Sequence, residues 1–497
     1  MQITLNHVSY SYPGSTQTVL ADVSAVFPQG WTGIIGNNGC GKSTLARIAA
    51  GLLSPDSGAA SPCGLVAAYC EQDATIAPAR LEDFACSWGQ RAVRLRAALG
   101  IDDDWPWRYD TLSSGQQKRL QVAVALWEEP DLLVMDEPTN HVDARTRHAI
   151  AHALASYQGL GLLISHDREL LDDLIIQCLC FEGPNVIMRP GSYTQVKGQA
   201  AREATSAQRQ RQDAKREVSR LQAEAARRSS EASRSATKRS ARYLDAKDHD
   251  GKERIKLAVY TGKDGVAGKL STRMGARLKK AQQALDDAYV NKEYAGDIWM
   301  DAEASPRKVF VCMEACDLTC GEHRLHVPDL AVGNTEHIGI AGVNGSGKTT
   351  LLTALMEAVP NDLSTLYIPQ EIGPEQAAHI MLALSDMSRN ERGRVLSIVA
   401  QLNSDPDRIL DGSELSPGEM RKLMLAQGIL CHPVLIAMDE PTNHLDVGSI
   451  EALERVLVAY PGALVLVSHD ERLLEKTTDF RWCLESGDGS AYVLRTA

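Results

Sequence analysis

Four short blocks occur twice in the chain, in the same order, and this repeat limits the possible folds more than any other feature. The copies are 306 residues apart for the first block and 303 residues apart for the other three. Because both order and spacing are kept, the chain holds two copies of one domain. We place the copies at 1–195 and 303–497, with a linker at 196–302. The paired blocks are 36–43 and 342–349, 112–116 and 415–419, 135–141 and 438–444, and 165–167 and 468–470.

The first block of each copy reads Gly-x-x-x-x-Gly-Lys-Ser/Thr, which is the P-loop motif. Its glycines let backbone N–H groups turn toward phosphate oxygens, and Lys42 and Lys348 add a positive charge. Each loop follows an apolar strand and precedes a helical stretch, so the motif predicts a P-loop α/β domain that binds a nucleotide. The predicted P-loop contacts are Gly36, Asn38, Gly39, Gly41, Lys42, Ser43, Thr44, Gly342, Asn344, Gly345, Gly347, Lys348, Thr349 and Thr350.

Each copy also contains an apolar run that ends in Asp-Glu, at Asp136 and Glu137 and at Asp439 and Glu440. Such a run is typical of a buried parallel strand, whose carboxyl end lies at the ligand-binding edge of the sheet. We expect the aspartates to hold Mg²⁺ and the glutamates to polarise the water that attacks the γ-phosphate. Helix or turn capping is the alternative role for the glutamates. The predicted metal-binding residues are Ser43, Gln72, Asp136, Thr349, Gln370 and Asp439.

His166 and His469 each follow a further apolar strand. A single histidine in this position is usually structural. Two histidines at matched positions, downstream of the phosphate-binding motifs, indicate a contact with the γ-phosphate. We therefore predict Glu137, Glu440, His166 and His469 as the catalytic residues.

The linker differs from both copies in charge. The whole chain carries a net charge of −12, yet residues 195–280 contain 23 basic and 10 acidic side chains. Residues 198–243 and 268–293 are rich in helix formers, and residues 245–265 contain turn sequences, so a helical hairpin is expected. The first helix would have only a narrow apolar seam of Val218, Leu221 and Ala225, and the second an apolar face of Leu270, Leu278, Ala281 and Leu285. A basic segment on an acidic chain indicates a polyanionic partner, and a solvated spacer is the alternative.

Several function classes are disfavoured by what the sequence lacks. No apolar run approaches the ~18 residues that would cross a bilayer, and residues 1–6 do not resemble a signal peptide. The 11 cysteines are scattered through the chain, which fits a reducing compartment better than a disulfide framework. We therefore expect a cytoplasmic protein without membrane insertion.

Residues 112–116, Leu-Ser-Ser-Gly-Gln, resemble the signature motif of the ATP-binding cassette superfamily. In that family the signature of one domain closes over the P-loop of the other. The resemblance implies ATP as the nucleotide and two composite sites, which join Lys42 to the second signature and Lys348 to the first. Asp143 and Asp446 match the D-loop aspartates of the family. The signature residues implied to contact ATP are Ser113, Gly115, Gln116, Ser416, Gly418 and Glu419.

More narrowly, the chain resembles the ABC-F proteins. Two cassettes share one chain, both acidic strands continue as Glu-Pro-Thr-Asn-His-x-Asp, and a basic helical linker joins the cassettes. The resemblance implies a monomeric translation factor that binds the ribosomal exit site while ATP-bound and leaves when ATP is hydrolysed to ADP and phosphate. Its linker would reach toward ribosomal RNA and the peptidyl-site tRNA. The predicted RNA-binding residues are Arg216, Arg220, Arg227, Arg228, Arg273, Arg277, Lys279 and Lys280.

The sequence departs from the family pattern at several positions. Ser114, Pro417 and Glu419 replace the usual signature residues, so the two ATP sites need not be equally active. Tyr12 matches the aromatic residue that stacks on adenine, but residues 318–320 of the second cassette contain no aromatic side chain. The adenine contact of the second cassette therefore stays open.

Other roles remain as alternatives. The first is the ATPase component of a membrane transporter, against which the basic linker counts. A DNA-repair ATPase would carry its coiled coil inside one cassette, and a ribosome-recycling protein would begin with a cysteine-rich segment. Within the ABC-F group, a housekeeping translation factor and an antibiotic-resistance protein remain open. The antibiotic or stalled state is open as well.

Overall fold

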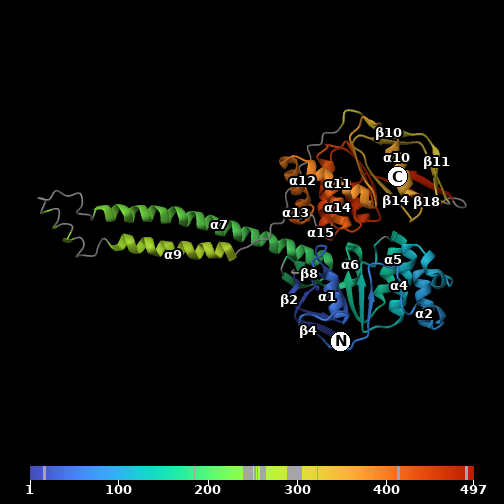
Figure 1. The fold of residues 1–497 in the computed structure, drawn as a ribbon, viewed down its shortest axis with the longest axis horizontal. Coiled ribbons are helices and arrows are strands. Elements are labelled where there is room, and N and C mark those ends of the chain that lie inside the picture. The colour runs from blue at the N-terminus through green and yellow to red at the C-terminus, as the bar shows by residue number, and fades with distance from the viewer. Residues whose placement is uncertain are drawn as a thin grey trace. The chain divides into compact units, whose positions relative to one another are not determined.

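The computed structural model shows two α/β cassettes and a long helical linker, which confirms the predicted fold class (Figure 1). Tertiary contacts divide the chain into one unit of Met1–Val196 with Glu293–Ala497 and a second unit of Lys197–Lys292. The domain limits at 195 and 303 stay predictions. The structure describes residues 1–14, 18–140, 142–183, 185–238, 250, 253, 256–257, 265–287, 305–321, 323–410, 415–486 and 491–496.

Cassette 1 is built on a six-stranded sheet in the order β5-β6-β7-β3-β8-β9. All neighbouring strands are parallel except β9, which pairs antiparallel with β8. A separate antiparallel sheet has the order β2-β1-β4. The apolar strands β6 and β7 are buried along their whole length, as their sequences predict. The strands are β1 (Gln2–Ser11), β2 (Thr18–Pro28), β3 (Gly30–Ile35), β4 (Ser57–Ser61), β5 (Ala67–Cys70), β6 (Leu132–Asp136), β7 (Leu160–Ile164), β8 (Ile175–Glu182) and β9 (Asn185–Pro190).

The parallel strands of cassette 1 end at one edge of the sheet, and the predicted site residues follow them there. The P-loop follows β3, Asp136 ends β6, and His166 follows β7. Carboxyl ends of parallel strands meet at one edge, so three distant sequence motifs become neighbours. The helices are α1 (Lys42–Ala49), α2 (Leu81–Cys86), α3 (Gln90–Leu99), the 3-10 helix η1 (Trp105–Thr111), α4 (Ser114–Trp127), α5 (Ala144–Ala155) and α6 (Arg168–Leu174).

Cassette 2 repeats this plan with an eight-stranded sheet in the order β11-β12-β19-β18-β14-β17-β16-β15 and a two-stranded sheet of β10 and β13. Its strands are β10 (Val309–Met313), β11 (Cys316–Cys320), β12 (His323–Val327), β13 (Leu330–Gly333), β14 (His337–Gly342), β15 (Thr365–Ile368), β16 (Leu435–Asp439), β17 (Ala463–Val467), β18 (Phe480–Ser486) and β19 (Ala491–Thr496). Its helices are α10 (Lys348–Glu357), α11 (Pro374–Asp386), α12 (Arg389–Gln401), α13 (Pro406–Leu410), α14 (Pro417–Ile429), α15 (Val447–Val458) and α16 (Glu471–Thr477).

The cores of both cassettes are mostly aliphatic, in keeping with the low aromatic content of 5%. Each cassette has two buried clusters. Val447 of cassette 2 packs into a core cluster of cassette 1, so the two cassettes share apolar contact as well as polar contact.

The linker contains the two helices that its composition predicts, α7 (Tyr193–Lys238) and α9 (Gly265–Asp287). With 46 residues, α7 would be roughly 70 Å long at 1.5 Å per residue. Val218 and Leu221 of α7 are buried, which agrees with the narrow apolar seam expected there. In α9 the expected face is partly wrong, because Leu270 is 39% exposed and Met274 is the buried residue. Met274 lies one turn after Leu270 on the same face of the helix, and the predicted face did not include it.

The predicted turn region of the linker, residues 245–265, lies largely outside the described residues, and so does its junction with cassette 2. Among the helices that the structure describes, none is both long enough and apolar enough to span a membrane.

Candidate ATP sites between the two cassettes

The P-loop of cassette 1 forms a polar cradle at the start of α1. Gly41 precedes the helix with a φ of 101°, a left-handed conformation that favours glycine. The ammonium group of Lys42 donates to the carbonyl oxygens of Gly36 at 2.8 Å and Asn37 at 3.0 Å. This places a cation inside the loop beside the helix N–H groups, an arrangement that binds phosphate.

The P-loop of cassette 2 has nearly the same geometry. Gly347 has a φ of 97°, and Lys348 donates to Gly342 at 2.9 Å and Val343 at 3.1 Å. A Cβ atom on Gly347 would lie 2.5 Å from the sulfur of Cys320, so only glycine fits there. The two loops are therefore equivalent in backbone shape and in the place of the lysine.

The predicted catalytic glutamate and histidine are neighbours in both cassettes. The backbone N–H of His166 donates to Glu137 at 3.2 Å, and that of His469 donates to Glu440 at 3.3 Å. The imidazole Nε2 atoms lie 3.2 Å and 3.5 Å from the other carboxylate oxygens. Glu137 and Glu440 have φ values of 49° and 46°, which costs a non-glycine residue roughly 1–2 kcal/mol. The same strained turn in both copies aims both carboxylates at the strand edge.

Burial changes the proton affinity of these groups. It raises the pKa of Glu137 to about 8 and that of Glu440 to about 7, because the charged carboxylate loses hydration. Burial likewise lowers the pKa of His166 to about 3 and that of His469 to about 4. Near pH 7 the imidazoles are therefore neutral, and each glutamate, once ionised, is a stronger base than an exposed glutamate.

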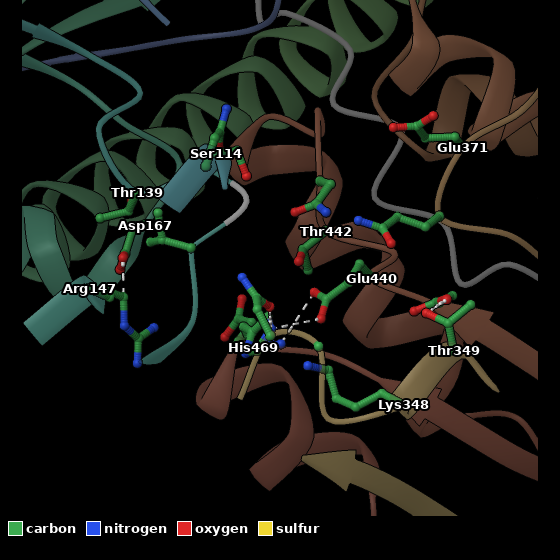
Figure 2. Close-up of a pocket in the computed structure, with 18 of the residues that line it drawn as sticks. Ser114, Thr139, Arg147, Asp167, Lys348, Thr349, Glu371, Glu440, Thr442 and His469 are labelled. Carbon is green, nitrogen blue, oxygen red and sulfur yellow. Dashed lines mark hydrogen bonds and ion pairs between the residues drawn. The ribbon is translucent and has the colours of Figure 1, made fainter. Parts of the chain in front are cut away.

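The second P-loop and the first signature line one cavity of 790 Å³ (Figure 2). Lys348, Thr349, Glu440 and His469 enter it from cassette 2, and Ser113 enters from cassette 1. This is the composite arrangement that the family resemblance implies for the second site. The volume lies within the 300–1,000 Å³ range of small-molecule sites. Gly115 and Gln116 are not among the described residues that line it.

Contacts also cross between the cassettes at the first P-loop. Asn38 donates to the carbonyl of His444 at 2.8 Å, and Asn403 donates to the side chain of Asn37 at 3.0 Å. Glu419 of the second signature pairs with Arg408 at 3.2 Å. A Cβ atom on Gly39 would lie 3.8 Å from the guanidinium of Arg408, so this arginine, which pairs with the second signature, lies beside the first P-loop.

Comparisons with known proteins identify the family of the chain. A family model described as "ABC transporter" matches residues 20–140 and 325–443. The ribosome protection protein VmlR of Bacillus subtilis (strain 168) is 30% identical over 495 residues, covering 96% of this chain and 85% of VmlR. The chain belongs to the ABC-F family.

Other ABC-F relatives match along most of the chain. The tylosin resistance ATP-binding protein TlrC of Streptomyces fradiae is 29% identical over 555 residues, covering 98% of each protein. Among solved structures, an RNase-L Inhibitor matches with a TM-score of 0.60 and 19% identity, covering 98% of this chain and 90% of that chain. This last likeness shows a shared tandem-cassette fold. Both cassettes of the ABC-F chain are thus ATP-binding domains.

The side chains at the strand edge of this ABC-F chain also fit a hydrated Mg²⁺ ion. The hydroxyl of Thr349 donates to one oxygen of Asp439 at 2.7 Å. The other oxygen of Asp439 is buried and, within the described residues, accepts no hydrogen bond. A buried, unsatisfied carboxylate oxygen beside a hydroxyl is a hard donor set, which suits Mg²⁺ shared with ATP phosphates.

The two ABC-F sites differ in the partners of their matched side chains. Asp136 accepts from the hydroxyl of Tyr69 at 2.7 Å, where Asp439 accepts from a threonine. Tyr12 bonds Thr44 at 2.9 Å and is 43% exposed, close to the first P-loop as expected. In cassette 2, Cys320 lines the cavity at the corresponding edge. Residues 318–320 contain no aromatic side chain, so the adenine contact of the second cassette stays open.

Two buried cations were missed by the sequence-based prediction. Lys118 donates to the carbonyls of Glu71 at 2.7 Å and Gln72 at 3.0 Å. Arg421 donates to the carbonyls of Gln370 and Asn443. Lys118 and Arg421 each lie three residues after the glycine of their signature, and they are 303 residues apart. The internal repeat could therefore have identified this basic position. Gln370 lines the cavity, whereas Gln72 is exposed in cassette 1.

Proposed function

We propose that this chain is an ATPase with two composite sites, which binds ribosomes while ATP-bound and leaves them after hydrolysis. The observation that carries the proposal is the shared cavity, in which Lys348 of one cassette and Ser113 of the other line the same space. Because a site split between two domains is completed only when they meet, ATP binding favours the closed pair. Closure within one chain also supports a monomeric protein.

The proposed roles follow from the positions of the side chains. The P-loop lysines and helix N–H groups hold the phosphates, and the opposite signature covers them. Mg²⁺ would be held by Asp136 or Asp439 and the neighbouring P-loop hydroxyl, and would neutralise phosphate charge. Glu137 and Glu440 orient the attacking water and accept its proton as the water oxygen bonds the γ-phosphorus. The bond to the β–γ bridging oxygen breaks, and ADP and phosphate leave. His166 and His469 fix the glutamates and contact the γ-phosphate.

The ribosome as partner is supported by the relatives and by the charge of the linker. VmlR is named a ribosome protection protein, and TlrC is named for tylosin resistance. The exposed cations of α7 and α9 suit RNA phosphates, and the local pair of Arg220 with Glu217 at 2.7 Å is itself solvent-exposed. We propose contacts with ribosomal RNA and the peptidyl-site tRNA near the exit site, in the cytoplasm. The result would be altered translation or protection from ribosome-targeting antibiotics.

The cycle predicts that a chain unable to hydrolyse ATP accumulates on ribosomes. With Glu137→Gln and Glu440→Gln together, ATP should stay bound and hold the closed pair, so ribosome occupancy in ATP should rise by ~10-fold or more over wild type. Co-sedimentation with purified ribosomes over a range of ATP measures this. The matched control, Glu82→Gln with Glu375→Gln, changes one exposed glutamate in each cassette and should behave as wild type. Equal occupancy of the trapped and wild-type chains would contradict the cycle, and association with membranes would favour a transporter ATPase instead.

The linker tip should act after binding. The tip, residues 244–263, lies largely outside the described residues, and its turns and mixed polarity are typical of a shaped probe. Shortening it should leave ribosome binding and ATP turnover within about twofold of wild type, because the cassettes and basic arms remain. The shortened chain should lose its effect on translation, or its protection from antibiotics as measured by drug susceptibilities with and without the gene. A shortened chain that retains the full effect would reduce the hairpin to a spacer.

A further inference from the structure

The first turn of α7 is fixed to cassette 1 by a cap from outside the helix. Asp172 of α6 accepts from the backbone N–H of Thr194 at 2.7 Å and from its hydroxyl at 2.6 Å. The first four N–H groups of any helix lack intrahelical partners, and a carboxylate is a strong acceptor for one of them. Val196, only 2% exposed, packs into the core cluster of cassette 1. The start of α7 is therefore part of the cassette unit, which extends to Val196.

The same turn also bonds to cassette 2. Arg472 of α16 donates to Asp172 at 3.1 Å, on the oxygen that also accepts from the hydroxyl of Thr194. The hydroxyl of Tyr193, a buried residue, donates to Glu451 of α15 at 3.1 Å. Burial would raise the pKa of Asp172, but hydrogen bonds from Thr194 and Arg472 hold it below its ordinary value. Asp172 thus serves as helix cap and as cross-cassette acceptor at once.

A second cross-cassette ion pair lies on the same helices. Arg168 of α6 contacts Glu454 of α15 and lies 3.2 Å from Asp470, which caps α16. The side chains of Arg168 and Glu454 are 4% and 6% exposed, so their pairing excludes water and depends on the two cassettes being together. This pair keeps α6 against α15 and α16, and so keeps Asp172 within reach of Arg472.

These contacts have no mirror image in the repeat. At the offset of 303, Arg472 corresponds to Glu169, Glu451 to His148 and Glu454 to Ala151. The residues of cassette 2 that bond to the start of α7, and Glu454, which pairs with Arg168, therefore have no equivalents in cassette 1. Two equivalent cassettes would need only the ATP sites for closure. The additional contacts of Arg472, Glu451 and Glu454 therefore indicate a separate role.

We propose that Asp172, Tyr193 and Arg472 are positioning residues through which the first turn of α7 responds to closure of the cassettes. When the cassettes separate, the bonds to Arg472 and Glu451 break, while the bond between Asp172 and Thr194 stays within cassette 1. The first turn of α7 is then bonded to cassette 1 alone, and its backbone hydrogen bonds open more often. Since α7 continues into the basic linker, the ATP state reaches the linker through this turn. The inference rests on the proposed closure by ATP.

Amide hydrogen exchange of the full chain tests the relay without ribosomes. The parent carries Glu137→Gln and Glu440→Gln, and exchange is compared in ATP and ADP for peptides that cover the signatures at 112–116 and 415–419 and for residues 190–200. In the parent, ATP should slow exchange in both places, by ~10-fold in the first turn of α7. With Arg472→Gln and Tyr193→Phe added, the signatures should still respond to ATP and the first turn of α7 should not. Using Arg472→Lys in place of Arg472→Gln keeps the cation and should restore most of the response of the first turn to ATP.

The control is Arg481→Gln, which removes an ion pair to Glu471 at 3.4 Å on the same helix α16 but within cassette 2. It should behave as the parent. An unchanged first-turn response in the Arg472→Gln, Tyr193→Phe chain would overturn the relay. So would a parent whose signatures respond to ATP while residues 190–200 do not. If the signatures do not respond to ATP in the parent, closure fails and the proposed function fails with it.

Discussion

Replacing both Glu137 and Glu440 by Gln is expected to lower ATP turnover by about 100-fold or more. Both carboxylates are buried at a strand edge next to a histidine, and burial raises their pKa, so the ionised carboxylate is a stronger proton acceptor than that of an exposed glutamate. Glutamine keeps the size and the hydrogen bond to the histidine N–H but cannot accept the proton. Steady-state phosphate release measures the loss, and ATP affinity should change little.

The single replacements separate the two sites. If the sites are unequal, one single variant should lose more turnover than the other. The pair Glu82→Gln and Glu375→Gln again serves as control, because both glutamates are exposed and lie away from the cavity. Turnover near the wild-type rate in the double Glu137, Glu440 variant would end the assignment of these residues as bases.

Removing four charges from α7 should weaken ribosome binding in a salt-dependent way. Arg216, Arg220, Arg227 and Arg228 become Gln, which keeps helix propensity but deletes the charge. Fewer phosphate contacts release fewer counterions, so the plot of log affinity against log salt should become shallower by up to about one unit for each phosphate left unpaired. Because several phosphates would lose their cation together, affinity at low salt should fall by ~100-fold or more. Ribosome binding titrated over salt measures both quantities.

A charge-matched control distinguishes specific contact from net charge. Replacing Arg94, Arg108, Arg145 and Arg495 by Gln removes the same four charges from exposed positions on the cassettes. Its salt slope should stay close to that of wild type. An unchanged slope in the α7 variant would make its arginines a solvated face that serves only local pairs, such as that of Arg220 with Glu217.

The local parts of the ATP sites could be predicted because each depends on a short run of sequence. A P-loop needs its glycines and lysine in fixed order, so Gly41 and Lys42 indicate both the loop shape and its ligand. The same holds for the apolar strand that ends at Asp439. Because each motif occurs in both copies, each copy supported the interpretation of the other as an α/β domain.

Contacts between segments that are far apart in sequence could not be predicted in this way. Nothing near Asp172 indicates that its partner is Arg472, 300 residues away, or that Arg408 lies beside the first P-loop. The left-handed backbone of Glu137 is imposed by tertiary structure against its own preference. In α9, Met274 replaced the expected Leu270 as the buried residue because burial depends on the facing surface.

The most direct test of the account is the structure of the Glu137→Gln, Glu440→Gln chain trapped on ribosomes in ATP. We predict that the cassettes occupy the exit site, with ATP on each P-loop covered by the signature of the other cassette. The basic helices should contact ribosomal RNA, and the linker should reach the peptidyl-site tRNA. A complex at another ribosomal surface would contradict the account. So would open cassettes in which the ATP on each P-loop is not covered by the signature of the other cassette.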